Sequence, residues 1–131
     1  MNETVIKTML ALGGGILSFM FGNWTTLLGV LVAFVILDYI TGLIAAYLNG
    51  DLNSEHGLKG IAKKVFIFAM VSVGNFVDIA LGSEPFIREV VIIFYISNEV
   101  ISILENAGKA GIPVPQKLKK AIKILQEKGR N

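Results

Sequence analysis

The feature that most constrains this chain is a long run without a charged residue. No Asp, Glu, Lys or Arg occurs from Thr8 to Leu37. As a single helix this run would extend roughly 45 Å, whereas the hydrocarbon core of a bilayer is about 30 Å thick. A helix on the surface of a soluble protein would show a polar face, and this run shows none. The run therefore predicts membrane-embedded segments that fold back on themselves.

The composition agrees with a membrane protein. Apolar residues make up 53% of the 131 residues and charged residues only 17%. Lipid offers no hydrogen-bond partners to the backbone, so each span is expected to be an α-helix. We predict an all-α integral membrane protein with a bundle of four, alternatively three, transmembrane helices and a basic amphipathic C-terminal helix. The predicted membrane domain covers residues 1–108, and a cytoplasmic tail covers residues 109–131.

Four apolar segments are separated by polar or glycine-containing stretches. The predicted spans are residues 8–21, 26–48, 65–81 and 89–105. The first is short for a crossing, so an interfacial or re-entrant segment is the alternative there. The stretch Asn49–Lys64 is predicted as a polar loop, and Gly82–Arg88 as a short one.

The distribution of basic residues predicts the orientation. With four crossings and the N-terminus inside, Arg88 is the only one of the 12 Lys and Arg residues that lies outside. Cytoplasmic loops carry an excess of Lys and Arg, so both termini are expected in the cytoplasm. With three crossings only the N-terminus changes side. Lys7 precedes an apolar run, but no convincing cleavage site follows, so we interpret this segment as a retained anchor. A start at Met9 is a further alternative, and it would remove Glu3 and Lys7.

The predicted fourth span carries a polar stripe. Its polar residues fall within an arc of roughly 120° on a helix, and the opposite side is apolar. Acids inside a membrane normally face a bundle interior or a water-filled cavity, and no cation stands among the acids and amides of this stripe. We predict eight pore-lining or interhelical residues on three spans: Asp38, Asp78, Tyr95, Asn98, Glu99, Ser102, Glu105 and Asn106. The alternative is that these residues only hold the helices together.

Small residues recur at helical spacing on the predicted spans. Such residues let helix backbones approach closely, both within a chain and between copies. The candidate helix-packing residues are Gly14, Ser18, Gly22, Gly42, Ala46 and Gly74. We therefore expect the chain to form a homo-oligomer.

The tail is strongly basic. A helix is expected after Pro115, with apolar residues on one face and lysines on the other. Beside so much apolar sequence, an anionic lipid surface is the expected partner rather than nucleic acid. The candidate headgroup-binding residues are Lys117, Lys119, Lys120 and Lys123. A solvated helix, or one packed on a neighbouring subunit, is the alternative.

Signatures of catalysis are weak. The chain has no cysteine, and its one histidine, His56, lies in the predicted polar loop. The glycines at 13–15 lack the Lys-Ser/Thr pair of a phosphate-binding loop. We therefore expect no catalytic residue, no metal site and no cofactor, and we predict that the protein is not an enzyme.

Three stretches resemble one family. They are "DYITG" (Asp38–Gly42), "GDLNSEHGLKGIAKK" (Gly50–Lys64) and "FYISNEVISILENAGKAGIPVPQKL" (Phe94–Leu118). Together they are similar to the toxin-secretion and phage-lysis holin family, which includes phage holins and holin-like proteins that release clostridial toxins. The resemblance implies a multi-pass protein of the bacterial cytoplasmic membrane. Such proteins associate with their own kind and open timed lesions, through which an endolysin or a toxin passes without direct contact being required. The motif positions matched here include Asp38, Asn98, Glu99, Glu105 and Asn106.

Two other classes of function are compatible with the hydrophobicity alone. A small ion channel or proton-coupled transporter would use Asp38, Asp78 and Glu99 as relay sites and would pass ions but not proteins. A non-conducting scaffold would hold a cytoplasmic partner through its basic tail and would change no permeability.

Overall fold

The computed structural model describes residues 2–130, and in that range the secondary structure is helical. Five helices follow one another: α1 (Glu3–Phe21), α2 (Thr26–Leu48), α3 (Ser54–Leu81), α4 (Ile87–Lys109) and α5 (Gln116–Arg130). The prediction of an all-α protein with a basic C-terminal helix is therefore confirmed.

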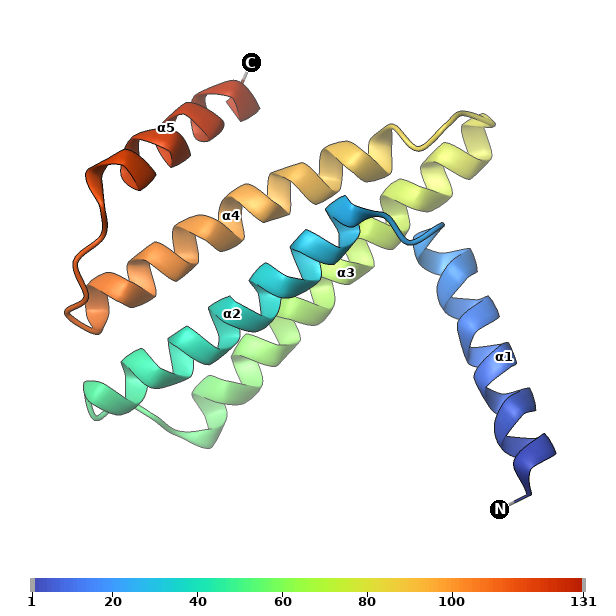
Figure 1. Cartoon of the computed structure of the whole chain (residues 1–131), viewed down its shortest axis with the longest axis horizontal. Coiled ribbons are helices and arrows are strands. Elements are labelled where there is room, and N and C mark those ends of the chain that lie inside the picture. Colours follow the sequence, from blue (N-terminus) through green and yellow to red (C-terminus); the bar gives the residue numbers. More distant parts are fainter. Residues whose placement is uncertain (1, 131) are drawn as a thin grey trace.

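Helices α2, α3 and α4 lie side by side and form the bundle of the molecule (Figure 1). In Figure 1, α2 and α4 run in the same direction and α3 runs in the opposite one. The apolar core between them consists of six buried residues: Leu28, Leu31, Val35, Ile67, Val71 and Ile92. Each helix therefore turns one apolar face inward, and the rest of its apolar surface stays exposed, as lipid contact permits.

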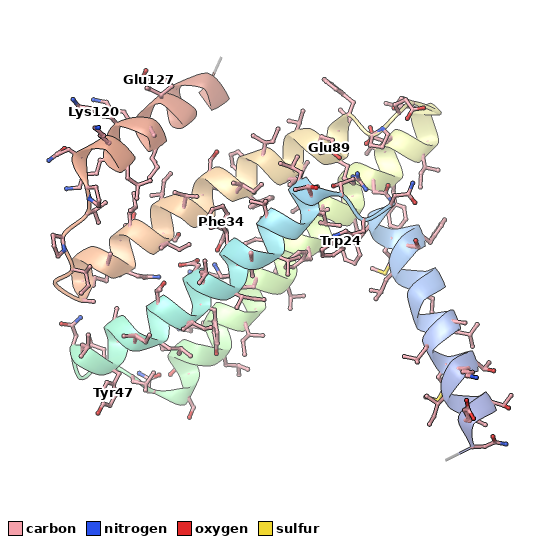
Figure 2. All side chains as sticks on the ribbon, in the orientation of Figure 1. Trp24, Phe34, Tyr47, Glu89, Lys120 and Glu127 are labelled. Carbon is pink, nitrogen blue, oxygen red and sulfur yellow. The ribbon has the colours of Figure 1, made fainter. Side chains whose placement is uncertain are left out.

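Helix α1 diverges from this bundle (Figure 1). None of its residues is buried, and its side chains project from the ribbon without a neighbouring helix over most of its length (Figure 2). It is held at its C-terminal end, where the Asn75 side-chain amide of α3 donates hydrogen bonds to the carbonyls of Phe19 (2.8 Å) and Met20 (2.9 Å). The helix begins at Glu3, five residues before the predicted span, with the Asn2 side chain as its N-cap.

Three helices within residues 2–130 are long and apolar enough to cross a membrane, namely α1, α2 and α3. Helix α1 has 19 residues, so it is not as short as its predicted span. Helix α4 carries several charged residues and lies against two of these helices. The chain is therefore a membrane protein by the length and composition of its helices.

The prediction of a loop from Asn49 to Lys64 was wrong for most of that stretch, because α3 begins at Ser54. The side chain of Asn53 caps the helix by accepting a hydrogen bond from the backbone N–H of His56 (2.7 Å). Such a cap stabilises a helix start even where the first turns are polar. Lys64 therefore lies inside a helix and not in a loop.

The turn between α3 and α4 is fixed by Asp78. Its carboxylate accepts hydrogen bonds from the backbone N–H groups of Phe86 (3.1 Å), Ile87 (2.9 Å) and Arg88 (2.9 Å). These are N–H groups of the first turn of α4, which have no partner within their own helix. Gly82 ends α3 in the left-handed conformation with φ 68°. Arg88, predicted in the loop, consequently lies in α4.

At Gly74 the backbones of α3 and α4 approach each other closely. A Cβ atom at this position would lie 3.0 Å from the Cα and 3.2 Å from the backbone N of Arg88. Backbone atoms cannot move aside as a side-chain tip can, so the two helices would have to separate.

We predict that Gly74→Ala destabilises the bundle by about 1–3 kcal/mol relative to a matched Gly15→Ala variant. Both changes replace a helical glycine, so the gain in helix propensity is shared. Nothing lies within 4 Å of a Cβ at Gly15, so the control adds no clash. Thermal unfolding in detergent measures the difference, and equal stability of the two variants would contradict the close contact.

Candidate functional site

The centre of the bundle contains an ion cluster, defined here as Asp38 of α2, Lys64 of α3 and Glu99 of α4. The Lys64 ammonium donates hydrogen bonds to both carboxylate oxygens of Glu99, at 2.8 Å to Oε1 and 2.7 Å to Oε2. It also pairs with Oδ2 of Asp38. One cation therefore joins two acids that come from two other helices.

The ion cluster is buried. Asp38 is 7% exposed and Glu99 is 3% exposed, and the side chain of Lys64 is 19% exposed. Removing charges from water is costly, and close pairing offsets that cost only in part. With all three groups ionised, the cluster has two negative charges and one positive charge. In that ionisation state the cluster joins three helices but is not electrically balanced.

Asn106 extends the cluster along the α2–α4 contact. Its side-chain amide donates hydrogen bonds to the backbone carbonyl (3.0 Å) and Oδ1 (2.8 Å) of Asp38, and to Oγ1 of Thr41 (3.0 Å). A Cβ at Gly42 would lie 3.5 Å from the same amide nitrogen, so the small residue leaves room for Asn106. The Asn49 side chain also donates to the carbonyl of Lys109 (3.0 Å).

The ion cluster lies on the same helix faces as the apolar core. Each charged residue lies seven positions from a fully buried apolar residue of its own helix: Asp38 from Leu31, Lys64 from Val71, and Glu99 from Ile92. Seven residues are about two helical turns, so each pair shares one helix face. The core faces of α2, α3 and α4 therefore bring the three charges together.

Sequence reasoning missed Lys64. It found no cation for the acids of α4, because the lysine was assigned to a loop. Two features of the sequence could have indicated Lys64. Asn53 is a helix N-cap, so the helix includes Lys64, and the seven-residue spacing from Lys64 to Val71 puts the lysine on the inner face of that helix. Asp38, Glu99 and Asn106 were selected from the sequence, and the structure brings them together.

The predicted polar stripe of α4 has two parts. Glu99 is buried, and Tyr95, Ser102 and Asn106 are half-buried. Asn98 and Glu105 are exposed, because they lie farther round the helix on its outer edge. Only the inner part of the stripe therefore faces the other helices of the same chain.

A second set of buried polar groups lies at the end of the bundle where α1 joins it and α3 turns into α4. Arg88 is 1% exposed, and its Nη1 donates hydrogen bonds to the carbonyls of Phe21 (2.8 Å) and Asn23 (2.9 Å). Its Nη2 pairs with Oε1 of Glu89 at 2.7 Å. A cation at the C-terminal end of α1 is favoured by the helix dipole. The prediction of Arg88 as a loop residue was wrong, because it lies in the first turn of α4 and is buried there. Asp78 lies at this end too, apart from the ion cluster.

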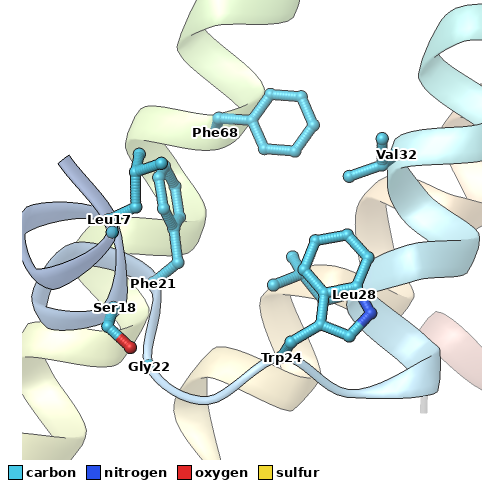
Figure 3. Close-up of a pocket in the computed structure, with 9 residues that line it drawn as sticks. Leu17, Ser18, Phe21, Gly22, Trp24, Leu28, Val32 and Phe68 are labelled. Carbon is cyan, nitrogen blue, oxygen red and sulfur yellow. The ribbon is translucent and has the colours of Figure 1, made fainter. Parts of the chain in front are cut away.

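The candidate packing residues have different surroundings. Gly14, Ser18 and Gly22 line an apolar hollow of about 330 Å³ between α1, α2 and α3, together with Trp24 and Phe68 (Figure 3). The hollow follows from the divergence of α1, and a Cβ at Gly14 would meet no atom within 4 Å. Gly42, Ala46 and Gly74 lie instead within the bundle, where Ala46 and Gly74 are buried.

The four candidate headgroup-binding lysines are exposed on α5: Lys117, Lys119, Lys120 and Lys123. Helix α5 folds back beside α4, and its Ile122 is only 6% exposed (Figure 1). Lys120 and Glu127 project away from α4 (Figure 2). The polar face of this helix is therefore available to another surface.

Among the described residues, no group of three or more His, Asp or Glu side chains is placed to hold a metal ion. The ion cluster itself is a pairing of charges, which holds three helices together as long as the charges stay paired.

Comparisons with known proteins point in one direction. The sequence profile of the bacteriophage holin family matches residues 15–127. The chain is 45% identical to an uncharacterised protein of Halalkalibacterium halodurans over 129 residues, which is 95% of this chain and 96% of that relative. It is 42% identical to an uncharacterised protein of Listeria monocytogenes over 126 residues, 96% of this chain and 90% of the relative. A probable holin of Bacillus phage phi105 is 28% identical over 109 residues, 83% of this chain and 80% of the relative. No solved structure matches the chain significantly.

We predict that Lys64→Met destabilises the protein by about 3–5 kcal/mol, because two buried carboxylates would lose their cation. Lys63→Met is the matched control, since the neighbouring lysine is exposed. The triple variant Lys64→Met, Asp38→Asn, Glu99→Gln should recover most of the loss, because it leaves no unpaired charge. Unfolding in detergent measures all three, and a loss no larger for Lys64→Met than for Lys63→Met would contradict the role of the cluster.

Proposed function

The chain belongs to the bacteriophage holin family, and from this premise we propose that it opens timed lesions in the bacterial cytoplasmic membrane. Copies of the chain accumulate, associate laterally and then admit an endolysin or a toxin, which need not contact them. The observation that carries this proposal is the buried ion cluster of Asp38, Lys64 and Glu99 between three long helices. Such a contact holds the three helices together until a rearrangement exposes the charged groups to water.

The proposed arrangement has four crossings with both termini in the cytoplasm. Helix α4 lies beside α2 and α3, so it shares their depth if they cross (Figure 1). Asp38 lies near the middle of α2, which spans Thr26–Leu48, so the ion cluster lies near mid-depth. Arg88 is buried, so the α1–α2 and α3–α4 connections present no exposed Lys or Arg. The remaining basic residues then lie in the cytoplasm or in the cytoplasmic half of α3, in agreement with the positive-inside rule.

The proposed switch is a change in the surroundings of the two carboxylates. In the closed state Asp38 and Glu99 share the single cation of Lys64 and carry an excess negative charge away from water. In a larger assembly the same faces can line an aqueous lesion, where hydration lowers the free energy of both acids. The excess charge favours the hydrated state, and the pairing with Lys64 opposes it.

The lysines of α5 fit the role of membrane-surface contacts. All four are exposed, and α5 begins at Gln116, a short connection after the cytoplasmic end of α4 at Lys109. We propose that Lys117, Lys119, Lys120 and Lys123 bind anionic headgroups of the cytoplasmic leaflet. Each lysine near such a surface adds attraction that falls off with salt.

Expression from a tightly controlled promoter tests the function. Membrane potential and escape of a large cytoplasmic reporter enzyme to the periplasm are followed together. Abrupt, delayed escape of the enzyme is the expected result. Loss of potential with the enzyme retained would instead favour a small ion channel or transporter, and no change in either signal would favour a scaffold.

We predict that Glu99→Gln delays the onset of enzyme escape at matched protein levels. This change leaves one carboxylate with one ammonium, so the closed state loses its excess charge and becomes more favourable. Glu3→Gln is the control, because Glu3 is exposed and forms a surface ion pair with Lys7. Identical onset times for the wild type and Glu99→Gln would remove the ion cluster from the mechanism.

We also predict that reporters fused to either terminus remain in the cytoplasm before the lesion opens. Two reporters are fused in turn to each terminus, one that is active only in the cytoplasm and one that is active only in the periplasm. Their activities show on which side of the membrane each terminus lies. An N-terminal reporter in the periplasm with a cytoplasmic C-terminal one would mean three crossings, with α1 outside or interfacial.

A further inference from the structure

The outer edge of α4, defined by Asn98 and Glu105, has no partner within the described part of the chain. Both residues are exposed, and no described side chain bonds to the Glu105 carboxylate. They are seven residues apart, so they share one face of the helix. Glu105 lies six residues beyond Glu99, or about 9 Å toward the cytoplasmic end, whereas half a hydrocarbon core is about 15 Å. This acid is therefore exposed at a depth where lipid contact is unfavourable.

A basic edge lies at the same depth on α3. It is defined by Lys59 and Lys63, which are four residues apart on one face and are both exposed. Lys64 and Glu99 are paired, so they serve as a common reference for depth. Because α3 runs opposite to α4, Lys59 lies about 7.5 Å from Lys64 toward the cytoplasmic end, the same end toward which Glu105 lies. Lys59 forms an exposed surface ion pair with Glu55 of its own helix, at 3.4 Å. The depths of Lys59 and Glu105 therefore agree to about 2 Å.

We propose that the outer edge of α4 in one copy docks against the basic edge of α3 in a second copy of this chain. Copies inserted in one membrane share an orientation, so groups at equal depth within one chain are at equal depth between chains. Glu105 then meets Lys59, and the Asn98 amide oxygen can accept a hydrogen bond from Lys63. An acid and a base that meet away from water attract strongly.

The proposed contact joins two different edges, so in a pair one copy keeps its α3 edge and the other keeps its α4 edge for further neighbours. Such a head-to-tail contact builds a ring or an open row rather than a closed dimer. The inference rests on the proposed function only in that α2, α3 and α4 cross the membrane. It uses none of the three residues of the ion cluster, so docking and lesion opening can be tested separately.

Cysteine cross-linking tests the contact directly, because the chain contains no cysteine. Two differently tagged single variants, Lys59→Cys and Glu105→Cys, are produced in the same cell and oxidised in the membrane. The expected product is a mixed dimer that exceeds either homodimer several-fold. The matched control replaces Lys59→Cys by Leu58→Cys, which is 69% exposed at the same depth but about 100° farther round the helix. Equal yields from the two pairs would overturn the proposal.

Charge reversal provides the second measurement. With Lys63→Cys and Asn98→Cys as the reporter pair, adding Lys59→Glu should reduce the mixed dimer several-fold. Adding Glu105→Lys as well should restore it, whereas a yield that stays low or never changes would contradict the pairing. Mixed dimers without enzyme escape would leave the docking intact and refute lesion formation. Enzyme escape without mixed dimers would refute the docking contact and leave lesion formation intact.

Discussion

The pairing of Lys64 with Asp38 and Glu99 is the contact on which the rest of the bundle depends. Three ionised groups cannot stay in an apolar interior unless they meet, so α2, α3 and α4 must pack in the one register that joins them. That register also brings Asn106 to Asp38 and places Asn98 and Glu105 on the outer edge of α4. The same contact therefore determines which polar groups of α4 are satisfied within the chain and which stay exposed at its surface.

The other end of the bundle satisfies its charges differently. There the partners of Asp78 and Arg88 are chiefly backbone groups at helix ends: N–H groups of α4 for the acid, and carbonyls at the end of α1 for the arginine. Hydrogen bonds to helix ends fix geometry locally and do not depend on a second side chain. This end holds the connection to α1 in place. The centre, by contrast, depends on side chains from three helices and is the part that a helix movement would break.

The sequence predicted the helical membrane fold and the residue range of α2, because a long uncharged run permits few alternatives. Within the candidate site, the sequence pattern selected Asp38, Glu99 and Asn106. It missed Lys64, because hydropathy alone assigns a lysine at the border of an apolar segment to the adjoining loop. The divergence of α1 could not be predicted, because it is anchored by Asn75 and Arg88, which are distant in sequence. Helix periodicity records which face a residue occupies, but not which helices meet.

In the proposed switch, the excess negative charge of the fully ionised cluster is what favours the hydrated state over the closed one. A pair of one acid and one lysine would have no excess charge. It would hold the helices together, and separating its two charges would be unfavourable in an assembly of any size. Two acids that share one lysine are held less firmly, and hydration of the released acid offsets part of the cost of opening. A ligand or an assembly can shift such an equilibrium only as far as the two states differ in free energy. The switch that we propose therefore requires a small free-energy difference between the closed and open states, so that lateral association alone can move the protein from one to the other.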